Sequence, residues 1–521
     1  MNLLLTIALT ILQFVPSGDL GERIARNFNR LEEEKYQPNK VFLTEVESND
    51  WPGDTEGRTI LGLVMDAKAS GREPKYLDEI IRRIPEHLNS QGYMGTIHPG
   101  IMHEQQLSGN GWMLRGLCEY YLWKNDDSVL DIIKSISYNL FAAGKGNYAN
   151  YPIKPEDRDK NIGDASGSTS SQIGNWALCS DIGCVFIGME GFIQAYSILK
   201  DESLKPIVEE MIDRFLQIDL IGIKAQTHAS LTACRGLMRY YGITGNKKYA
   251  EEALKRWDLY KQYGMTEHFA NYNWFRRYDT WTEPCAIVDS YLLAYQLWEY
   301  TKDSKFLDDA ELIYYNALCR AQRENGGFGL DNCPGLASGT DNVGVHTYEA
   351  HWCCTMRGGE GLGRAAEYAF KLDGNKLYVP FYQSGTYKYD QGGKQLIIEE
   401  ESEYPAKGRV SFSIKQNSFG KKIKLLIPVR PWMEDVVLFK NGKTLKISNP
   451  QDGFITIKSR LKKGDAVQMT FTNQEGKWPT LNSENTLPNS YKKHVGSVLL
   501  DENNKPIYLD YSFPRRVIFH D

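Results

Sequence analysis

The feature that most limits how this chain can fold is a helical hairpin that repeats along it. In each copy an apolar helix ends in an aromatic residue, a short polar turn follows, and a second apolar helix begins. A hairpin that cannot bury its own apolar face must stack on its neighbours, in an open solenoid or in a closed ring. The clearest copies are residues 119–130, 195–204, 239–249 and 299–306, with weaker ones at 64–77 and near Tyr368.

The connections between the hairpins favour the closed ring. Segments 147–175, 263–282 and 324–349 are long and irregular, whereas the turns within hairpins are short. Long loops in a compact domain are usually functional, and at one end of a ring they would build one deep site. We therefore predict a mainly α fold for residues 18–372, an (α/α)6 toroid of six helical hairpins.

Beyond residue 372 the apolar pattern changes from a helical period to alternation, which is typical of strands. Runs such as 376–389, 395–401 and 408–416 alternate, and turn pairs such as Asn441-Gly442 follow between later runs. We predict an antiparallel β-sandwich over residues 373–521. Residues 1–17 are predicted to be an N-terminal strand, which could pair with the sandwich, or a leader.

Composition excludes several classes of protein. The net charge of -5 gives no basic surface for nucleic acid. Nine cysteines, an odd number spread over residues 118–354, do not suggest a disulfide framework. No apolar run is long enough to predict a transmembrane helix, and the apolar N-terminus lacks the charged start and cleavage site of a signal peptide.

The residue types around two adjacent cysteines indicate metal chemistry. Cys353 and Cys354 lie in the stretch 349–356, with His346 and His351 nearby, and Glu283 and Cys285 form a second thiol–carboxylate pair upstream. Three thiolates and one carboxylate would complete a tetrahedral zinc site if the fold brings them together. The alternative is that these cysteines are small buried apolar side chains.

Several motifs together resemble glycoside hydrolase family 127, the zinc-dependent cysteine glycosidases of the β-L-arabinofuranosidase type. The resemblance extends from about residue 20 to 431, and the Glu-x-Cys with Cys-Cys combination is its most specific part. The motifs are Trp51-Pro-Gly-Asp-Thr-Glu-Gly-Arg58, His103-Glu-Gln-Gln106, His228 ahead of a helix, Glu267 followed by Phe269, Glu283-Pro-Cys285 and Cys353-Cys354.

The resemblance implies a role for each residue of the site. It implies Zn²⁺ bound by Glu283, Cys285, Cys353 and Cys354, with Cys353 as nucleophile and Glu267 as general acid/base. Zinc would hold the thiol of Cys353 as thiolate, and two displacements through a thioglycosyl-enzyme would retain the anomeric configuration. Without the resemblance, a solvated loop carboxylate is the more usual interpretation of Glu267, and spacing alone does not choose between the two.

The sugar is predicted from the remaining polar residues. By the resemblance His103 and His228 line a sugar subsite, and Asp54 could bind hydroxyls or cap a helix. Arg276 and Arg277 could bind an acidic sugar through their planar guanidinium groups or form surface salt bridges. The family pattern Cys-Cys-Pro-Pro-Asn is replaced here by Cys-Cys followed by Thr355-Met-Arg-Gly-Gly359.

We therefore expect an exo-acting retaining glycosidase that removes β-L-arabinofuranose, or the related acidic sugar aceric acid, from an oligosaccharide such as plant pectin. The alternatives are a carboxylate-only (α/α)6 glycosidase or polysaccharide lyase, and a non-catalytic glycan-binding protein. A periplasmic location is expected, with the cytoplasm as alternative. A homodimer is compatible with the sequence.

Overall fold

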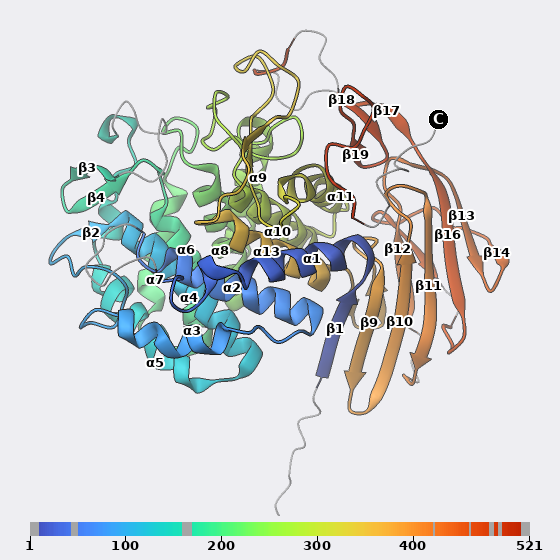
Figure 1. Cartoon of the computed structure of the whole chain (residues 1–521), viewed down its shortest axis with the longest axis horizontal. Helices are drawn as coiled ribbons and strands as arrows, with labels where there is room; N and C mark the ends of the chain where they lie inside the picture. The colour runs from blue at the N-terminus through green and yellow to red at the C-terminus, as the bar shows by residue number, and fades with distance from the viewer. Residues whose placement is uncertain are drawn as a thin grey trace, which may run out of the picture.

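The computed structural model describes residues 10–42, 51–158, 169–419, 423–457, 460–478, 484–487 and 492–511. A helical part occupies one side of the molecule and a set of β-sheets the other (Figure 1). The predicted fold class, a helical toroid followed by antiparallel sheets, is confirmed. None of the described helices is long and apolar enough to cross a lipid bilayer.

Six of the described helices form an inner ring, in which each packs against the next and the last packs against the first. Most of their residues are buried, charged ones included, so their buried residues are not confined to one face of each helix. These helices are α2 (Asp54–Ser70), α4 (Glu104–Lys124), α6 (Val185–Leu199), α8 (Thr227–Thr244), α10 (Pro284–Thr301) and α13 (Cys354–Tyr368).

Each inner helix has an outer partner with one apolar face. Helix α1 shows the pattern, with Leu20, Ile24, Phe28 and Leu31 buried at helical spacing. The outer helices are α3 (Leu77–Arg83), α5 (Leu130–Ser135), α7 (Lys205–Leu216), α9 (Lys247–Tyr263), α11 (Lys305–Ile313) and α1 (Gly18–Leu31); a short α12 (Cys319–Ala321) follows α11.

The weak hairpin copy near Tyr368 is corrected by the structure. Among the described residues no α-helix follows α13 in sequence; the chain enters strand β7 (Lys371–Asp373) instead. Helix α1, from the other end of the chain, packs against both α13 and α2 and takes the place of the missing partner. The ring is therefore closed by segments more than 300 residues apart, a pairing that no local pattern reveals.

The largest described sheet is antiparallel throughout and begins with the N-terminal strand β1 (Thr10–Pro16), which pairs with β9 (Gly385–Gln391). Figure 1 shows β1 lying along the edge of the sheet, beside β9. The other strands follow in the order β10 (Lys394–Ser402), β11 (Arg409–Asn417), β16 (Ala466–Asn473), β13 (Met433–Lys440) and β14 (Lys443–Leu445).

A second sheet has the order β15 (Phe454–Ile457), β12 (Lys424–Pro428), β8 (Lys376–Tyr378) and β7. Within it β12 and β8 run parallel. The run 376–389, predicted as one strand, is divided between β8 and β9 in different sheets. Pro380 lies in the break, where the missing N–H of proline does not interrupt a ladder.

Three smaller sheets lie beside the helical part. One consists of β17 (Glu475–Trp478), β18 (Lys492–Val495) and β19 (Val498–Leu499). The other two are β2 (Met102–His103), β4 (Trp176–Cys179) and β3 (Thr169–Ile173), and the pair β5 (Leu330–Asp331) and β6 (Val345–Thr347). Several of the connections at the N-terminal ends of the inner helices carry these strands.

Candidate active site

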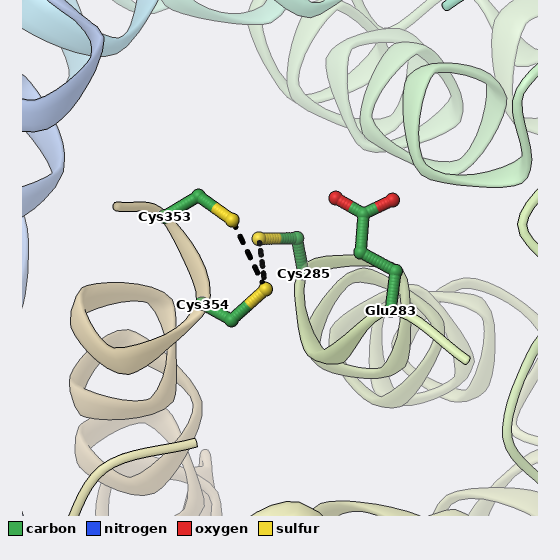
Figure 2. A group of neighbouring side chains, drawn as sticks. All are labelled: Glu283, Cys285, Cys353 and Cys354. Atoms are coloured by element: carbon green, nitrogen blue, oxygen red, sulfur yellow. Dashed lines mark hydrogen bonds between the residues drawn. The ribbon is translucent and has the colours of Figure 1, made fainter. Parts of the chain in front are cut away.

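The predicted zinc ligands meet at the N-terminal ends of two neighbouring inner helices. Glu283 is the residue before α10, and Pro284 and Cys285 are the first two residues of that helix. Cys353 is likewise the residue before α13, and Cys354 is its first residue. Because α10 and α13 pack side by side, their first turns lie next to each other. Figure 2 shows the sulfur atoms of the three cysteines turned toward one another.

The donor atoms have the spacing of a metal site. One ligand atom from each of the four residues lies within 4.8 Å of the others. The Sγ atoms of Cys353 and Cys354 are 3.1 Å apart, and those of Cys285 and Cys354 are 3.6 Å apart. Sulfur ligands of a tetrahedral zinc ion are about 3.8 Å apart. None of the three cysteines forms a disulfide, so the set fits zinc in both chemistry and spacing.

An arginine from α2, the neighbour of α13 in the ring, supplies positive charge to the thiols. Arg58 of α2 donates from Nη1 to Cys285 Sγ at 3.1 Å and stacks 4.2 Å above the ring of Trp112. Burial favours the neutral thiol of Cys285, but its hydrogen bonds with Cys353 and Cys354 and the charge of Arg58 outweigh this effect. The pKa of Cys285 is therefore well below its ordinary value.

Asp54 has a clear partner within the protein. Its two carboxylate oxygens accept hydrogen bonds of 2.7 and 2.9 Å from Arg58, one turn further along α2. The Asp54 side chain is almost fully buried. Asp54 therefore orients the guanidinium group that contacts Cys285. Both residues lie in the motif 51–58, but the sequence did not predict this role for either of them.

His228, at the start of α8, lies between two carboxylates. Its Nδ1 is 3.2 Å from Glu283 Oε1, and its Nε2 is 3.4 Å from Asp289 Oδ2. Burial lowers the pKa of His228, but the Glu283 carboxylate more than offsets this and the pKa is raised. His228 thus holds Glu283, the predicted zinc ligand, in place, as hydrogen-bonded residues behind the ligands do in metal sites.

Asp289 is a further residue that sequence reasoning missed. It lies one helical turn after Cys285 on α10, and its carboxylate accepts hydrogen bonds from Arg235 and Arg357, both at 2.5 Å. Asp289 follows Cys285 by four residues and so lies on the same face of the helix. This spacing could have identified it from the sequence. Arg357 is fully buried, and its positive charge is paired with the carboxylate of Asp289.

Glu267 lies in a tight turn in which Met265 pairs with Asn271. The side-chain oxygen of Asn271 accepts a 2.9 Å hydrogen bond from the backbone N–H of Glu283, which ties this turn to the cluster. Glu267 is 3% exposed, and burial raises the pKa of its carboxyl although Lys492 lowers it. A raised pKa is what a general acid needs at neutral pH.

His103 ends strand β2 directly before α4 and faces a cavity of 230 Å³. Its ring stacks on that of His98 with the centroids 5.0 Å apart. Burial and the neighbouring His98 lower the pKa of His103 to about 4. It is therefore a neutral imidazole at physiological pH, able both to donate to and to accept from a hydroxyl group.

The two adjacent arginines form ion pairs with carboxylates of the protein. Arg276 donates two hydrogen bonds, of 2.8 and 2.9 Å, to Glu484. Arg277 does the same to Asp279 at 2.9 and 3.0 Å. Arg276 and Arg277, which suggested an acidic sugar, are therefore both paired within the protein. Arg357 is buried as well, so none of the three arginines supports an acidic sugar.

A second group of potential ligands was not predicted. One ligand atom each of Glu104, Cys179 and Cys184 also lies within 4.8 Å of the others. The carboxylate of Glu104, however, already accepts from the backbone N–H of Cys179 at 2.8 Å and pairs with Arg158 at 3.5 Å. These contacts account for the buried carboxylate without a metal ion.

Comparison with solved structures finds the same fold over nearly the whole chain. A glycoside hydrolase superposes with a TM-score of 0.70 at 14% identity, covering 94% of this chain and 83% of its own. A GH127 β-arabinofuranosidase gives 0.69 at 16% identity, covering 94% and 85%. The GH127 β-L-arabinofuranosidase of Geobacillus stearothermophilus T6 gives 0.67 at 13%, covering 93% and 86%. No curated protein sequence matches the chain.

Two family descriptions match the sequence itself. The catalytic domain of GH127 β-L-arabinofuranosidase matches residues 190–367, which contain Glu267 and all four residues of the cluster. The middle domain of the same family matches residues 376–473. Together the two matches cover more than half of the chain. The chain therefore belongs to glycoside hydrolase family 127, the family of the β-L-arabinofuranosidases.

Proposed function

We propose that this glycoside hydrolase releases a terminal β-L-arabinofuranose from an oligosaccharide, with retention of configuration, by means of a zinc-held cysteine nucleophile. The observation that carries the proposal is the set of three thiols and one carboxylate at the N-termini of α10 and α13. A site that only binds glycan has no need of such a set. The neutral sugar is preferred because Arg276, Arg277 and Arg357 are engaged with carboxylates of the protein.

Burial separates the roles of the cysteines. Cys285 and Cys354 are fully buried, whereas Cys353 is partly exposed and can reach a substrate. We assign Cys353 as nucleophile and the other two, with Glu283, as ligands only. Zinc, when bound, keeps the cysteines deprotonated at neutral pH. Arg58 adds positive charge beside the thiolates and Asp54 holds it there.

The reaction then proceeds in two displacements. The sulfur of Cys353 attacks the anomeric carbon, the glycosidic C–O bond breaks, and the carboxyl proton of Glu267 passes to the leaving oxygen. Water next attacks the same carbon while the Glu267 carboxylate takes up its proton, and the C–S bond breaks to return the thiolate. His103, as a neutral imidazole, is assigned to a sugar hydroxyl. Two inversions give net retention.

The test uses a synthetic β-L-arabinofuranosyl disaccharide with the zinc-loaded protein. We expect arabinose with retained configuration by NMR, about one zinc per chain, and loss of turnover by at least about 10³-fold in Cys353→Ser. Cys234→Ser, at a buried cysteine in α8, is the matched control and should keep its activity. In Glu267→Gln with an aryl furanoside, intact mass should show one anhydropentose on Cys353.

Three results would overturn parts of the proposal. An inverted product or a fully active Cys353→Ser would remove the cysteine mechanism and favour a carboxylate-only enzyme. Release of aceric acid but no arabinose would correct the sugar. Binding of the disaccharide without product after long incubation would favour a glycan-binding protein.

A further inference from the structure

Strand β18, from the C-terminal part of the chain, brings a lysine to the proposed general acid. Lys492 Nζ lies 3.4 Å from Glu267 Oε2, and both side chains are largely buried. Thr486 Oγ1 donates to the other oxygen of the same carboxylate, Oε1, at 3.4 Å. More than 200 residues separate these partners from Glu267 in sequence.

The sheet that carries Lys492 is fixed to the helical part. Asn316 donates from Nδ2 to the carbonyl of Ser497 at 2.8 Å, and its Oδ1 accepts from the backbone N–H of Leu499 at 2.8 Å. Both contacts are buried. The position of Lys492 beside Glu267 is therefore set by the packing of β18 and β19 rather than by the lysine side chain alone.

Other ionisable groups around Glu267 do not replace this cation. Asp341, on the loop before β6, is acidic and lies 3.8 Å from Lys492 Nζ. His268 is neutral, because burial lowers its pKa to about 3. Tyr272 is also neutral, because burial raises its pKa. Arg320 lines the same cavity as Lys492 and is paired with Asp331 at 3.4 Å. Among the described residues, Lys492 is thus the cation that pairs with Glu267.

We propose that Lys492 is a positioning residue for catalysis, which orients the Glu267 carboxyl group and sets how tightly it holds its proton. This inference rests on the proposed role of Glu267 as general acid/base. That role requires the carboxyl to be protonated before the first displacement and ionised during the second. Burial alone favours the protonated form, and a nearby ammonium favours the ionised form. Lys492 therefore keeps both forms accessible.

The variant Lys492→Met removes the charge and keeps the length of the side chain. Lys492 lines a cavity of 560 Å³, so the replacement has room. Loss of an opposite charge at this distance raises a carboxyl pKa by about one unit or more. We expect the alkaline limb of the kcat/KM profile to move up by about one pH unit, and kcat at neutral pH to fall more than kcat/KM.

Two further variants complete the test, with an arabinofuranosyl disaccharide as substrate and the zinc-loaded full chain. Lys493→Met changes the next residue, whose Nζ pairs with Asn504, and should leave the profile in place. Lys492→Arg keeps the charge and should restore the wild-type alkaline limb. If Lys492→Met does not fold, Lys492→Gln serves in its place.

The outcomes separate this inference from the proposed function. An unmoved alkaline limb in Lys492→Met or Lys492→Gln, with Glu267→Gln inactive, would overturn the role of Lys492 alone. Full activity of Glu267→Gln on the disaccharide would overturn the role of Glu267 and, with it, that of Lys492.

Discussion

Single residues around the cysteine–glutamate cluster determine what each proposed ligand can do. Arg58 contacts the thiol of Cys285, and His228 contacts the carboxylate of Glu283. Each is held in turn by a carboxylate, Asp54 for the arginine and Asp289 for the histidine. The thiol-rich cluster therefore lies inside a second layer of alternating charges, and such layers tune both metal affinity and the basicity of the ligands.

A different buried carboxylate, Asp66 of α2, makes the stability of the chain depend on pH. Neither of its side-chain oxygens has a hydrogen-bond partner among the described residues. Burial raises the pKa of Asp66 well above its ordinary value, and Arg72 opposes this only partly. The unfolded chain releases this proton near pH ~4, whereas the folded chain keeps it to higher pH. The free energy of unfolding thus falls as pH rises between these two values.

We therefore expect Asp66→Asn to be more stable than the wild type at pH 7, by about 1 kcal/mol or more. The difference should shrink as the pH falls toward 5, where the wild-type carboxyl is protonated in the folded state. Thermal unfolding of both proteins at the two pH values measures it. Asp131→Asn, at an exposed aspartate of α5, should show no such dependence. A variant equally destabilised at both pH values would contradict the expectation.

At the scale of elements, the inner ring depends on close contact between helix backbones. A Cβ atom added to Gly111 of α4 would lie 2.4 Å from the Cα of Gly188 in α6. One added to Gly191 would lie 2.1 Å from the carbonyl oxygen of Gly111. No side chain can give way at these points, because the obstacle is the neighbouring backbone. Glycine is required here for close approach and not for its conformational freedom.

Gly111→Ala should consequently lower stability by about 1–3 kcal/mol or more, because it forces α4 and α6 apart. The matched control is Gly242→Ala in α8, where an added Cβ meets no atom within 4 Å. That substitution should stabilise by up to about 1 kcal/mol, since alanine favours a helix. Chemical denaturation of both variants gives the comparison. Equal effects of the two alanines would refute the backbone contact.

At the scale of the whole molecule, a buried ion pair joins the β-sheets to the helical ring. Arg430, which follows β12, donates from Nε to Glu311 of α11 at 2.7 Å. Asp308 of the same helix lies 3.5 Å from the guanidinium group, and Tyr404 donates to Glu311. Both partners of the main pair are almost fully buried. Removing one of them leaves an uncompensated charge out of contact with water.

Arg430→Met should therefore destabilise the chain by about 3–5 kcal/mol, measured by denaturant unfolding followed by tryptophan fluorescence. Arg409→Met breaks an exposed pair with Glu403 and should cost less than about 1 kcal/mol. Adding Glu311→Gln to Arg430→Met should recover part of the loss, since it removes the orphaned charge. No recovery in the double variant would contradict this account.

Local patterns were enough to predict the classes of secondary-structure element and the residue types of the cluster. Helical and alternating periods are local properties, so the hairpins ending at residues 130, 204, 249 and 306 could be found from spacing alone. The Glu-x-Cys and Cys-Cys motifs are local as well, and the structure brings their four residues together.

What surrounds those residues depends on how distant segments of the chain pack together. The ring is closed by α1 and not by a helix after Tyr368, and Arg276 and Arg277 pair with carboxylates of the protein. Asp54 and His228 contact Arg58 and Glu283, and Lys492 reaches Glu267 from a distant strand. Charges act through space over a few ångströms, and proximity between segments hundreds of residues apart leaves no periodic trace in a single sequence.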